Sequence, residues 1–527
     1  MEKRIVVATV LSTLVILAWW MWVTPPAKML PPQTQAQSGT KPADQPCVLS
    51  GNDASQMPAV GVPGKGNQKA VKVTDTVLKF NSFEVVFNSL GAKIKNWYVK
   101  EKGNCLTDLV YYPADNSFVP DNFATFNNLN FNVITQTQDS IIFSAVTDNV
   151  RIIKTYELSE TGLHKLEFQL TNLSNKEKVF PLNIPWGPGI GSTPSDQKSE
   201  VAFTRLIGLA KITDKSSKIV KLKADSHNTR AYNWIGIDNR YFLMSVLSNE
   251  SFSKALVNID KTAIGKLPKI DFVSTVKIPA GKSVSIGLSF YLGPKVYSEL
   301  KKTGHGLDQS VDFGFFSSLG KGAFYSLHYF YGITKNYGVA IIILTLIMQI
   351  VLFPLTMKSY QASKAMRILQ PKMKEMQTKF KGDPKRLNVE MLNLYKSHKV
   401  NPLSGCLPML LQLPIFWALY QTLSNTYELR KAPFIFWMTD LSAPDLLFTV
   451  SGVPIRVLPL LMGGAMFFQQ KASGTTMDPS QKSLMYMMPI IFTVIFWNFA
   501  SGLVLYWLIN SILTLAGQYI VMRPKEA

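Results

Sequence analysis

The stretch YGVAIIILTLIMQIVLFPLTMKSY, residues 337–360, decides the fold class of this 527-residue chain. Its first 20 residues carry no charge and are long enough to cross the hydrocarbon core of a bilayer as a helix. A primary amide, Gln349, nevertheless lies in the middle, four residues after Thr345, so both side chains share one helical face. An unpaired amide in an apolar medium costs roughly 2–7 kcal/mol. We therefore expect this face to meet other polar groups or water.

Other apolar runs have the length of membrane helices: residues 5–23, 403–423, 454–470 and 484–521. The last run is too long for one crossing, and the sequence FASG inside it is suited to a turn between two helices. The sequence therefore predicts a polytopic α-helical membrane protein with six transmembrane helices and both termini in the cytoplasm.

The run at 5–23 follows Lys3 and Arg4 and ends in a cluster of tryptophans, as membrane-interface residues would. A cleaved signal peptide is the alternative, but no small-residue cleavage site follows the run. We predict an uncleaved transmembrane anchor at 1–26. The next segment, 27–70, is rich in Pro, Gln, Gly and Ser and is predicted to be a flexible periplasmic linker.

From residue 71 to residue 312 the hydrophobic period changes to two. Ile286, Leu288 and Phe290 alternate with small or polar residues, and similar alternation recurs between turn-forming residues. This pattern predicts a large antiparallel β-sandwich, and the single crossing before it places that domain outside the cytoplasm. Residues 313–335 are aromatic and interrupted by glycine, which predicts an interfacial amphipathic helix. A linker helix packed on the β domain is the alternative.

Much of the net charge of +21 gathers beside the spans rather than on a nucleic-acid-binding face. Residues 357–400 contain eleven basic and three acidic residues, which places them in the cytoplasm. Their apolar residues repeat at intervals of three and four on both sides of KGDP, where Asp383 suits a helix N-cap and Pro384 a first turn. We predict a helical hairpin with the seam Met366, Leu369, Met373, Met376, Phe380, Leu387, Met391 and Leu394. Pro371 should kink its first helix.

The hairpin has two interpretations that the sequence leaves open. It is either a solvated arm held together by its own seam, or a docking arm for an acidic partner such as ribosomal RNA or lipid head groups. The candidate contact residues for such a partner are Lys364, Arg367, Lys372, Lys374, Lys385 and Arg386.

Polar residues also occur in other predicted spans. Gln412 lies between two prolines, and the last span has an i, i+4, i+8 stripe of Asn510, Thr514 and Gln518. These side chains either bond pairwise across a tight bundle or line a hydrated groove. The predicted core spans hold no Asp, Glu or Lys, which argues against a coupled transporter.

The sequence contains no recognisable catalytic or phosphate-binding motif, and its histidines and cysteines match no metal-ligand spacing. We expect neither enzymatic activity nor a cofactor or metal. The topology puts Cys47 and Cys105 outside the cytoplasm, and the sequence leaves open whether they form a disulfide.

Six blocks between residues 337 and 521 resemble the YidC membrane protein insertase family in sequence and order. They are YGVAIIILTLIMQIVLFPLT, LQPKMKEMQ, LYKSHKVNPLSGCLPMLLQLPIFWALY, ELRKAPFIFWMTDLS, LPLLMGGAMFFQQK and MPIIFTVIFWNFASGLVLYW. The anchor followed by a β domain is similar to the Gram-negative, inner-membrane form. The resemblance implies a five-helix insertase core at 336–521, a short cytoplasmic tail at 522–527 and a periplasmic β-supersandwich.

The resemblance also implies a function: insertion and folding of inner-membrane proteins, alone or beside the Sec translocon, through a hydrophilic groove open to the cytoplasm and to lipid. Thr345 and Gln349 fall at groove positions, and Tyr506 and Trp507 fall where the family contacts the nascent segment. The hairpin matches the arm that recruits ribosomes and signal recognition particle machinery. The implied partners are thus nascent membrane proteins, the Sec translocon and the phospholipid bilayer.

One departure from the family is that Gln349 stands where the family usually has an arginine. The amide keeps the polarity of the site and loses its charge, so we hypothesise that hydration of the groove is sufficient for function. A channel or transporter with a periplasmic ligand-binding domain, or an envelope scaffold, is the alternative function. The substrates, the oligomeric state and the ligand of the β domain are not specified by the sequence.

Overall fold

The computed structural model describes residues 73–522, except for 104, 111–117, 121–128, 194–199, 214–215, 263–264, 399–406, 452 and 474–478. The predicted anchor, the predicted linker and the last residues of the tail lie outside the described residues. The described chain forms two compact units, a β unit up to Val311 and a helical unit from Asp312 onward.

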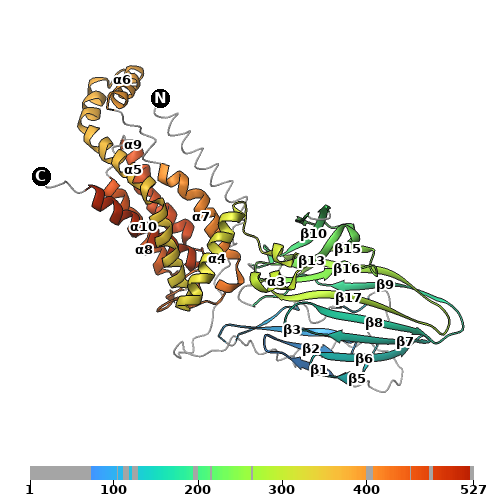
Figure 1. Cartoon of the computed structure of the whole chain (residues 1–527). Coiled ribbons are helices and arrows are strands. Elements are labelled where there is room, and N and C mark those ends of the chain that lie inside the picture. The colour runs from blue at the N-terminus through green and yellow to red at the C-terminus, as the bar shows by residue number, and fades with distance from the viewer. Residues whose placement is uncertain are drawn as a thin grey trace. The chain divides into compact units, whose positions relative to one another are not determined.

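The β unit contains three antiparallel sheets (Figure 1). One has four strands in the order β1-β2-β3-β4: β1 (Asp75–Lys79), β2 (Phe83–Asn88), β3 (Lys93–Glu101) and β4 (Cys105–Asp108). A second has four strands in the order β12-β15-β16-β9: β9 (Lys178–Trp186), β12 (Ser226–Asn228), β15 (Lys254–Thr262) and β16 (Gly265–Ile278).

The largest sheet has nine strands in the order β11-β10-β13-β14-β17-β8-β7-β6-β5. Its strands are β5 (Asn132–Gln136), β6 (Ser140–Thr147), β7 (Val150–Glu157), β8 (His164–Asn172), β10 (Arg205–Thr213), β11 (Ser216–Lys221), β13 (Tyr232–Asp238), β14 (Phe242–Leu247) and β17 (Ser283–Pro294). The short helices of the unit are η1 (Thr229–Ala231), α3 (Tyr297–Thr303) and η2 (Leu307–Ser310).

The alternation read from the sequence produces the core of this unit. Strand β8 buries every second residue, and β17 does the same over Ile286, Leu288 and Phe290. Phe87 of β2 meets Tyr156 of β7 with ring centroids 4.8 Å apart, so the first four-stranded sheet packs face to face on the largest sheet. The prediction of a large antiparallel β-sandwich is confirmed.

His164 and Lys154 are among the ionisable side chains buried in the β unit. His164 lies among the rings of Phe83, Trp97 and Phe290, and its Nδ1 accepts a hydrogen bond from the Ser159 N–H at 3.2 Å. Burial lowers the pKa of His164 to about 3 and is opposed only in part by a backbone hydrogen bond at Leu292. The Lys154 ammonium donates to the Phe118 carbonyl at 2.8 Å, and burial lowers its pKa well below the usual value.

The helical unit contains α4 (Ser317–Thr334), α5 (Tyr337–Lys379), α6 (Pro384–Ser397), α7 (Leu407–Asn425), η4 (Tyr427–Leu429), α8 (Val457–Ser473), α9 (Pro479–Phe496) and α10 (Ser501–Met522). A two-stranded sheet, β18 (Phe448–Val450) and β19 (Val453–Ile455), precedes α8. Among the described residues, Tyr337–Met366 and Ser501–Val521 are long and apolar enough to cross a membrane, and Tyr486–Phe496 is apolar but shorter. The turn expected at FASG separates α9 from α10.

Helix α5 is 43 residues long and runs without interruption through Pro354 and Pro371. The segment read from the sequence as a first core span and the first arm of the hairpin are therefore one helix. Each proline removes one backbone hydrogen bond without ending the helix. The helix thus continues from the core into the arm, and the kink expected at Pro371 stays a prediction.

Helix α4 packs on α5 and α7 of the same unit. Its inner face contains Phe324 and Leu327, and the Thr422 hydroxyl of α7 donates to the Gly320 carbonyl at 3.2 Å. The outer face leaves large apolar side chains exposed: Leu319, Tyr325, Tyr329 and Ile333. This two-faced helix has the amphipathic character that the sequence predicts for residues 313–335, and its position at a membrane surface stays a prediction.

Candidate functional site

Gln349 bonds across the bundle to α10. Its Nε2 donates to Asn510 Oδ1 and, at 3.4 Å, to the Thr514 hydroxyl, which itself donates to the Asn510 carbonyl at 2.8 Å. The i, i+4 spacing read from the sequence places Asn510 and Thr514 on the face of α10 that meets α5. At 1.5 Å per residue, Gln349 lies about 18 Å along α5 from its first residue, a little over half the thickness of a hydrocarbon layer of about 30 Å.

All three members of this polar group are half-buried rather than sealed. Each therefore has a bonded side toward the neighbouring helix and an open side. The interhelical bonds are those expected of a tightly bonded bundle, and the partial exposure is what a polar surface accessible to a passing chain requires. The two interpretations left open by the sequence are thus compatible at this position.

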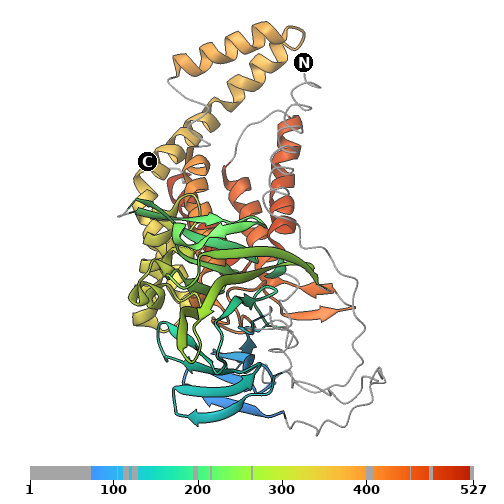
Figure 2. The same ribbon diagram turned by 90° about the vertical axis from the view of Figure 1, so that its right-hand side faces the viewer.

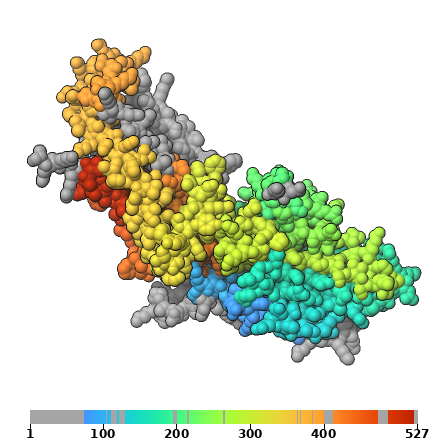
Figure 3. Space-filling view, viewed as in Figure 1, coloured from blue at the N-terminus to red at the C-terminus, as the bar shows by residue number. Residues whose placement is uncertain are grey.

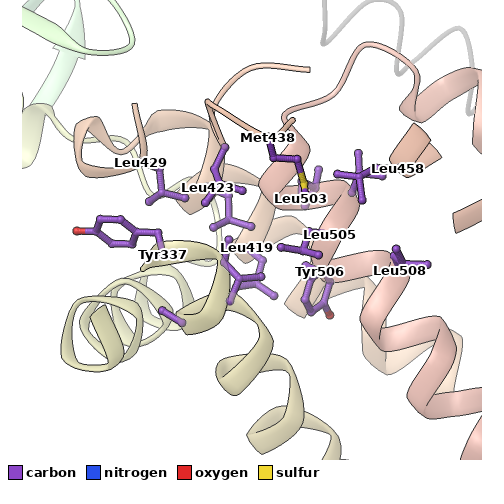
Figure 4. Packing of buried hydrophobic residues seen from close by; sticks show 14 of the residues in the cluster. Tyr337, Leu419, Leu423, Leu429, Met438, Leu458, Leu503, Leu505, Tyr506 and Leu508 are labelled. Carbon is purple, nitrogen blue, oxygen red and sulfur yellow. The ribbon is translucent and has the colours of Figure 1, made fainter. Parts of the chain in front are cut away.

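A second polar contact joins α7 to α10. The Gln412 amide donates to the Tyr506 hydroxyl, which is otherwise enclosed, since Tyr506 is only 2% exposed. Figure 4 shows the Tyr506 ring beside Leu505 and Leu419, with its hydroxyl directed away from Leu505. The bond satisfies a hydroxyl that would otherwise be costly to bury.

Trp507, the next residue, lies in an aromatic cluster formed by three helices. Its ring lies 5.0 Å from Phe416 of α7 and 5.6 Å and 5.3 Å from Phe492 and Phe496 of α9, measured between centroids. The indole remains partly exposed. Trp507 therefore provides a large apolar surface beside the polar contacts.

Thr345 does not lie on an open surface. It is fully buried, and its hydroxyl donates to the Ile341 carbonyl of its own helix at 2.7 Å. It adjoins the apolar cluster that fills the end of the bundle where α5 and α10 begin, around Ile341, Leu344, Leu503 and Leu505. The predicted site residues thus divide into a half-exposed group, with Gln349, and a buried group, with Thr345 and Tyr506.

The sequence did not identify the residues that close this end of the bundle. Asn336 caps α5 by accepting from Gly338 N–H at 2.8 Å, and its amide donates to the Phe434 carbonyl at 3.1 Å. The Gly502 N–H of α10 donates to the Leu441 carbonyl at 2.9 Å. A loop after α7 therefore binds the N-terminal ends of both long apolar helices. The available signal was the cap residue Asn336 before an apolar run.

The hairpin formed by α6 and the second half of α5 extends beyond the other helices of the unit (Figure 3). Leu369, Met373 and Leu394 are buried between its two helices, with Met366, Met376, Met391 and Tyr395 packed around them. The Asp383 carboxylate caps α6 by accepting from the Arg386 N–H at 3.1 Å, as the sequence predicts.

The basic side chains of the hairpin lie around this seam. Lys372, Lys374, Lys385 and Arg386 are exposed, and Lys364 is half-buried. The Arg367 side chain lies outside the described residues. This surface can attract an acidic partner, although the Arg386 guanidinium also lies over the ring of Phe380, 5.6 Å from its centroid.

Cys105 at the start of β4 is disulfide-bonded. The chain's other cysteines, Cys47 and Cys406, both lie outside the described residues. Among the described residues, no group of three or more His, Cys, Asp or Glu could hold a metal ion.

Two family models match most of the chain. The model for the 60Kd inner membrane protein matches residues 329–527, and the model for the YidC periplasmic domain matches residues 109–326. A membrane protein insertase YidC from Endomicrobium trichonymphae is 38% identical over 535 residues, covering 100% of this chain and 99% of the relative. The chain belongs to the YidC membrane protein insertase family.

Other YidC relatives are similarly complete. The YidC insertase of Geotalea daltonii is 35% identical over 554 residues and covers both chains fully. Among solved structures, an active YidC insertase is 19% identical, with 84% of this chain and 92% of that chain covered, at a TM-score of 0.39. Because that TM-score is low, the assignment to the YidC family rests on the sequence relatives and the family models.

Proposed function

We propose that this protein inserts membrane proteins into the bilayer and helps them fold, using the surface formed by α5, α7 and α10 as the path of the entering segment. One observation carries the proposal: the bonded, half-exposed group of Gln349, Asn510 and Thr514 lies inside two helices long enough to span a membrane. Moving polar backbone and side chains through hydrocarbon is costly. A polar surface at mid-depth shortens the distance over which these groups have no hydrogen-bonding partner.

The entering segment needs apolar contact as well as polar contact. Trp507, about one turn before Asn510 on α10, and its aromatic neighbours on α7 and α9 suit the apolar face of a transmembrane helix. A helix that slides past this surface first contacts its amide and hydroxyl groups. It then leaves these contacts and is surrounded by lipid. No covalent step and no cofactor is needed for such a transfer.

The proposed topology has six spans, with both termini in the cytoplasm, in the bacterial inner membrane. The names of the matching family models support an inner-membrane protein with a periplasmic domain. The excess of basic residues on the α5–α6 hairpin supports its placement in the cytoplasm. In that location the hairpin would receive ribosomes or signal recognition particle machinery, and the Sec translocon is a proposed partner of the core.

Site-specific photocrosslinking tests the path. A photoreactive amino acid at position 349 or 507 should crosslink to ribosome-stalled nascent chains carrying a transmembrane segment. Ile350, which adjoins Gln349 and is 71% exposed, is the matched control, because its side chain is rotated about 100° around the helix from that of Gln349. Crosslinks that are equally strong from position 350, or absent from 349 and 507, contradict the proposed path.

Reconstitution separates an insertase from a channel or transporter. Purified protein in liposomes should integrate a small single-span substrate without any solute gradient. Failure to integrate it, together with solute flux through the same liposomes, favours the alternative function.

A further inference from the structure

A small β-hairpin in the helical unit has no role in the proposed path. Residues 446–455, here named the apolar hairpin, contain no charged residue. Phe448 pairs with Ile455 and Val450 with Val453, and the chain turns between them at Ser451, whose φ is 48°. Positive φ at this position is typical of tight two-residue hairpin turns.

The apolar hairpin leaves its large side chains uncovered. Each of the following is between 42% and 57% exposed: Leu446, Leu447, Phe448, Val450 and Val453. Among the described residues no further strand pairs with either outer edge of this two-stranded sheet, and an apolar patch on such a sheet is a liability in water. Such a surface indicates a partner.

Both ends of the apolar hairpin are fixed to the bundle. The Asp445 carboxylate accepts from the N–H groups of Val457 and Leu458 at 3.0 and 2.9 Å, capping α8. The Arg456 guanidinium donates to the Trp497 carbonyl and, at 2.6 Å, to Asn498 Oδ1 in the turn before α10.

The apolar hairpin is thereby held at the end of the unit where α8 and α10 begin, and Figure 2 shows its two short strands projecting there, in orange. The same end holds the start of α5, through the bond between Asn336 and Phe434. Two of these three helices are long and apolar enough to span a membrane, so in the proposed topology this end lies where they leave the bilayer.

We propose that the apolar hairpin lies in the membrane interface at the end of the bundle where α8 and α10 begin. Its side chains contact phospholipid at the boundary between head groups and acyl chains. Lipid can reach this surface because the apolar hairpin directly precedes α8 and is bonded to the turn before α10. The open strand edges exclude the hydrocarbon centre, where their N–H and C=O groups would have no partner, whereas the interface supplies water and head-group oxygens. The contact anchors the starts of α8 and α10 at a fixed depth.

This lipid contact is separate from insertion activity, so it is tested without an insertion assay. Phe448→Cys and Val450→Cys in the full chain are labelled with an environment-sensitive fluorophore in nanodiscs of phosphatidylethanolamine and phosphatidylglycerol, one copy per disc. The unsubstituted chain, labelled in the same way, corrects for native cysteines. The matched control is Ile212→Cys on β10, an apolar position of similar exposure at 60% in the β unit.

Doxyl-labelled lipid should quench the fluorophore at 448 and 450 at least about twofold more than at 212, and aqueous iodide should show the reverse order. Equal quenching by iodide at all three positions, with no effect of doxyl lipid, overturns the proposal. Protection from both quenchers also overturns it, because another part of the same chain would then cover the apolar hairpin. Unchanged melting temperatures of the labelled variants establish that they are folded.

Discussion

The substitution Gln349→Leu tests whether a mid-membrane amide is needed. It removes the donor that binds Asn510 and Thr514 and places an apolar side chain of similar size in the same half-buried position. Interhelical hydrogen bonds in membranes contribute about 0.6 kcal/mol on average and up to about 1.7. We expect the free energy of unfolding to fall by about 1 kcal/mol, which leaves the protein folded.

The effect on insertion should be larger than the effect on folding. A polar group of the entering segment that loses this contact loses about 1–2 kcal/mol in the transition state, and insertion should be roughly 5- to 30-fold slower. Gln349→Arg keeps hydrogen-bond donors at the position and should insert substrate at nearly the rate of the unsubstituted protein.

The assay is the initial rate of protease-protected substrate in proteoliposomes, with a melting curve for each variant. The neighbouring exposed position supplies the control, Ile350→Leu, which should leave the rate unchanged. If Gln349, Gln349→Leu and Gln349→Arg give the same rate at equal protein content, the hydrated polar surface is not part of the mechanism. If only Gln349→Arg is active above background, charge rather than polarity is decisive.

Three other predictions concern the remaining parts of the molecule. Because the pKa of buried His164 is about 3 and that of an unfolded histidine is about 6.5, the unfolded state binds more protons between these values, and stability should fall as pH decreases through this window. The loss of stability should reach about 2–3 kcal/mol by pH 4.5 in tryptophan-monitored melts. If a His164→Phe variant loses as much stability over the same pH range, the loss does not come from His164. Cys105 should be paired with Cys47, so mass spectrometry of a non-reduced digest should yield that linked peptide, and a linkage to any other cysteine contradicts the prediction. Leu394→Asp should unfold the α5–α6 hairpin at a cost of about 2–4 kcal/mol and expose it to protease, whereas Val389→Asp, on the exposed side of α6, should not; equal protease sensitivity would show that the seam does not hold the hairpin.

The periodic spacing of apolar residues predicted most of the fold. The period of two in HKLEFQL and SVSIGLSF is sufficient to identify buried strand faces, because neighbouring side chains of a strand point to opposite sides. Spacings of three and four among apolar residues, separately on α5 and on α6, identified the hairpin seam in which Leu369, Met373 and Leu394 are buried, for the corresponding reason in helices. Strand order could not be read in this way, since the nine-stranded sheet joins β17 to β8 across more than a hundred residues.

The polar residues of the candidate site were visible in the sequence because an amide in an apolar span is costly without a partner. Their partners were not visible. Gln349 meets Asn510, which is 161 residues away along the chain, while Thr345, one turn earlier, is enclosed by the bundle. The difference between these two side chains depends on how α5 and α10 approach each other, and spacing within one helix does not contain that information.

By itself, the sequence determined which segments are apolar enough to leave water, which strands alternate and where the basic residues gather, because these are local properties of composition and period. The tertiary structure alone decided that α5 is one continuous helix, that Asp445 and Arg456 fix the apolar hairpin to the bundle, and that Gln412 meets Tyr506. These contacts join residues distant in the chain, and they form only when packing brings the helices together and leaves each buried polar group with a partner.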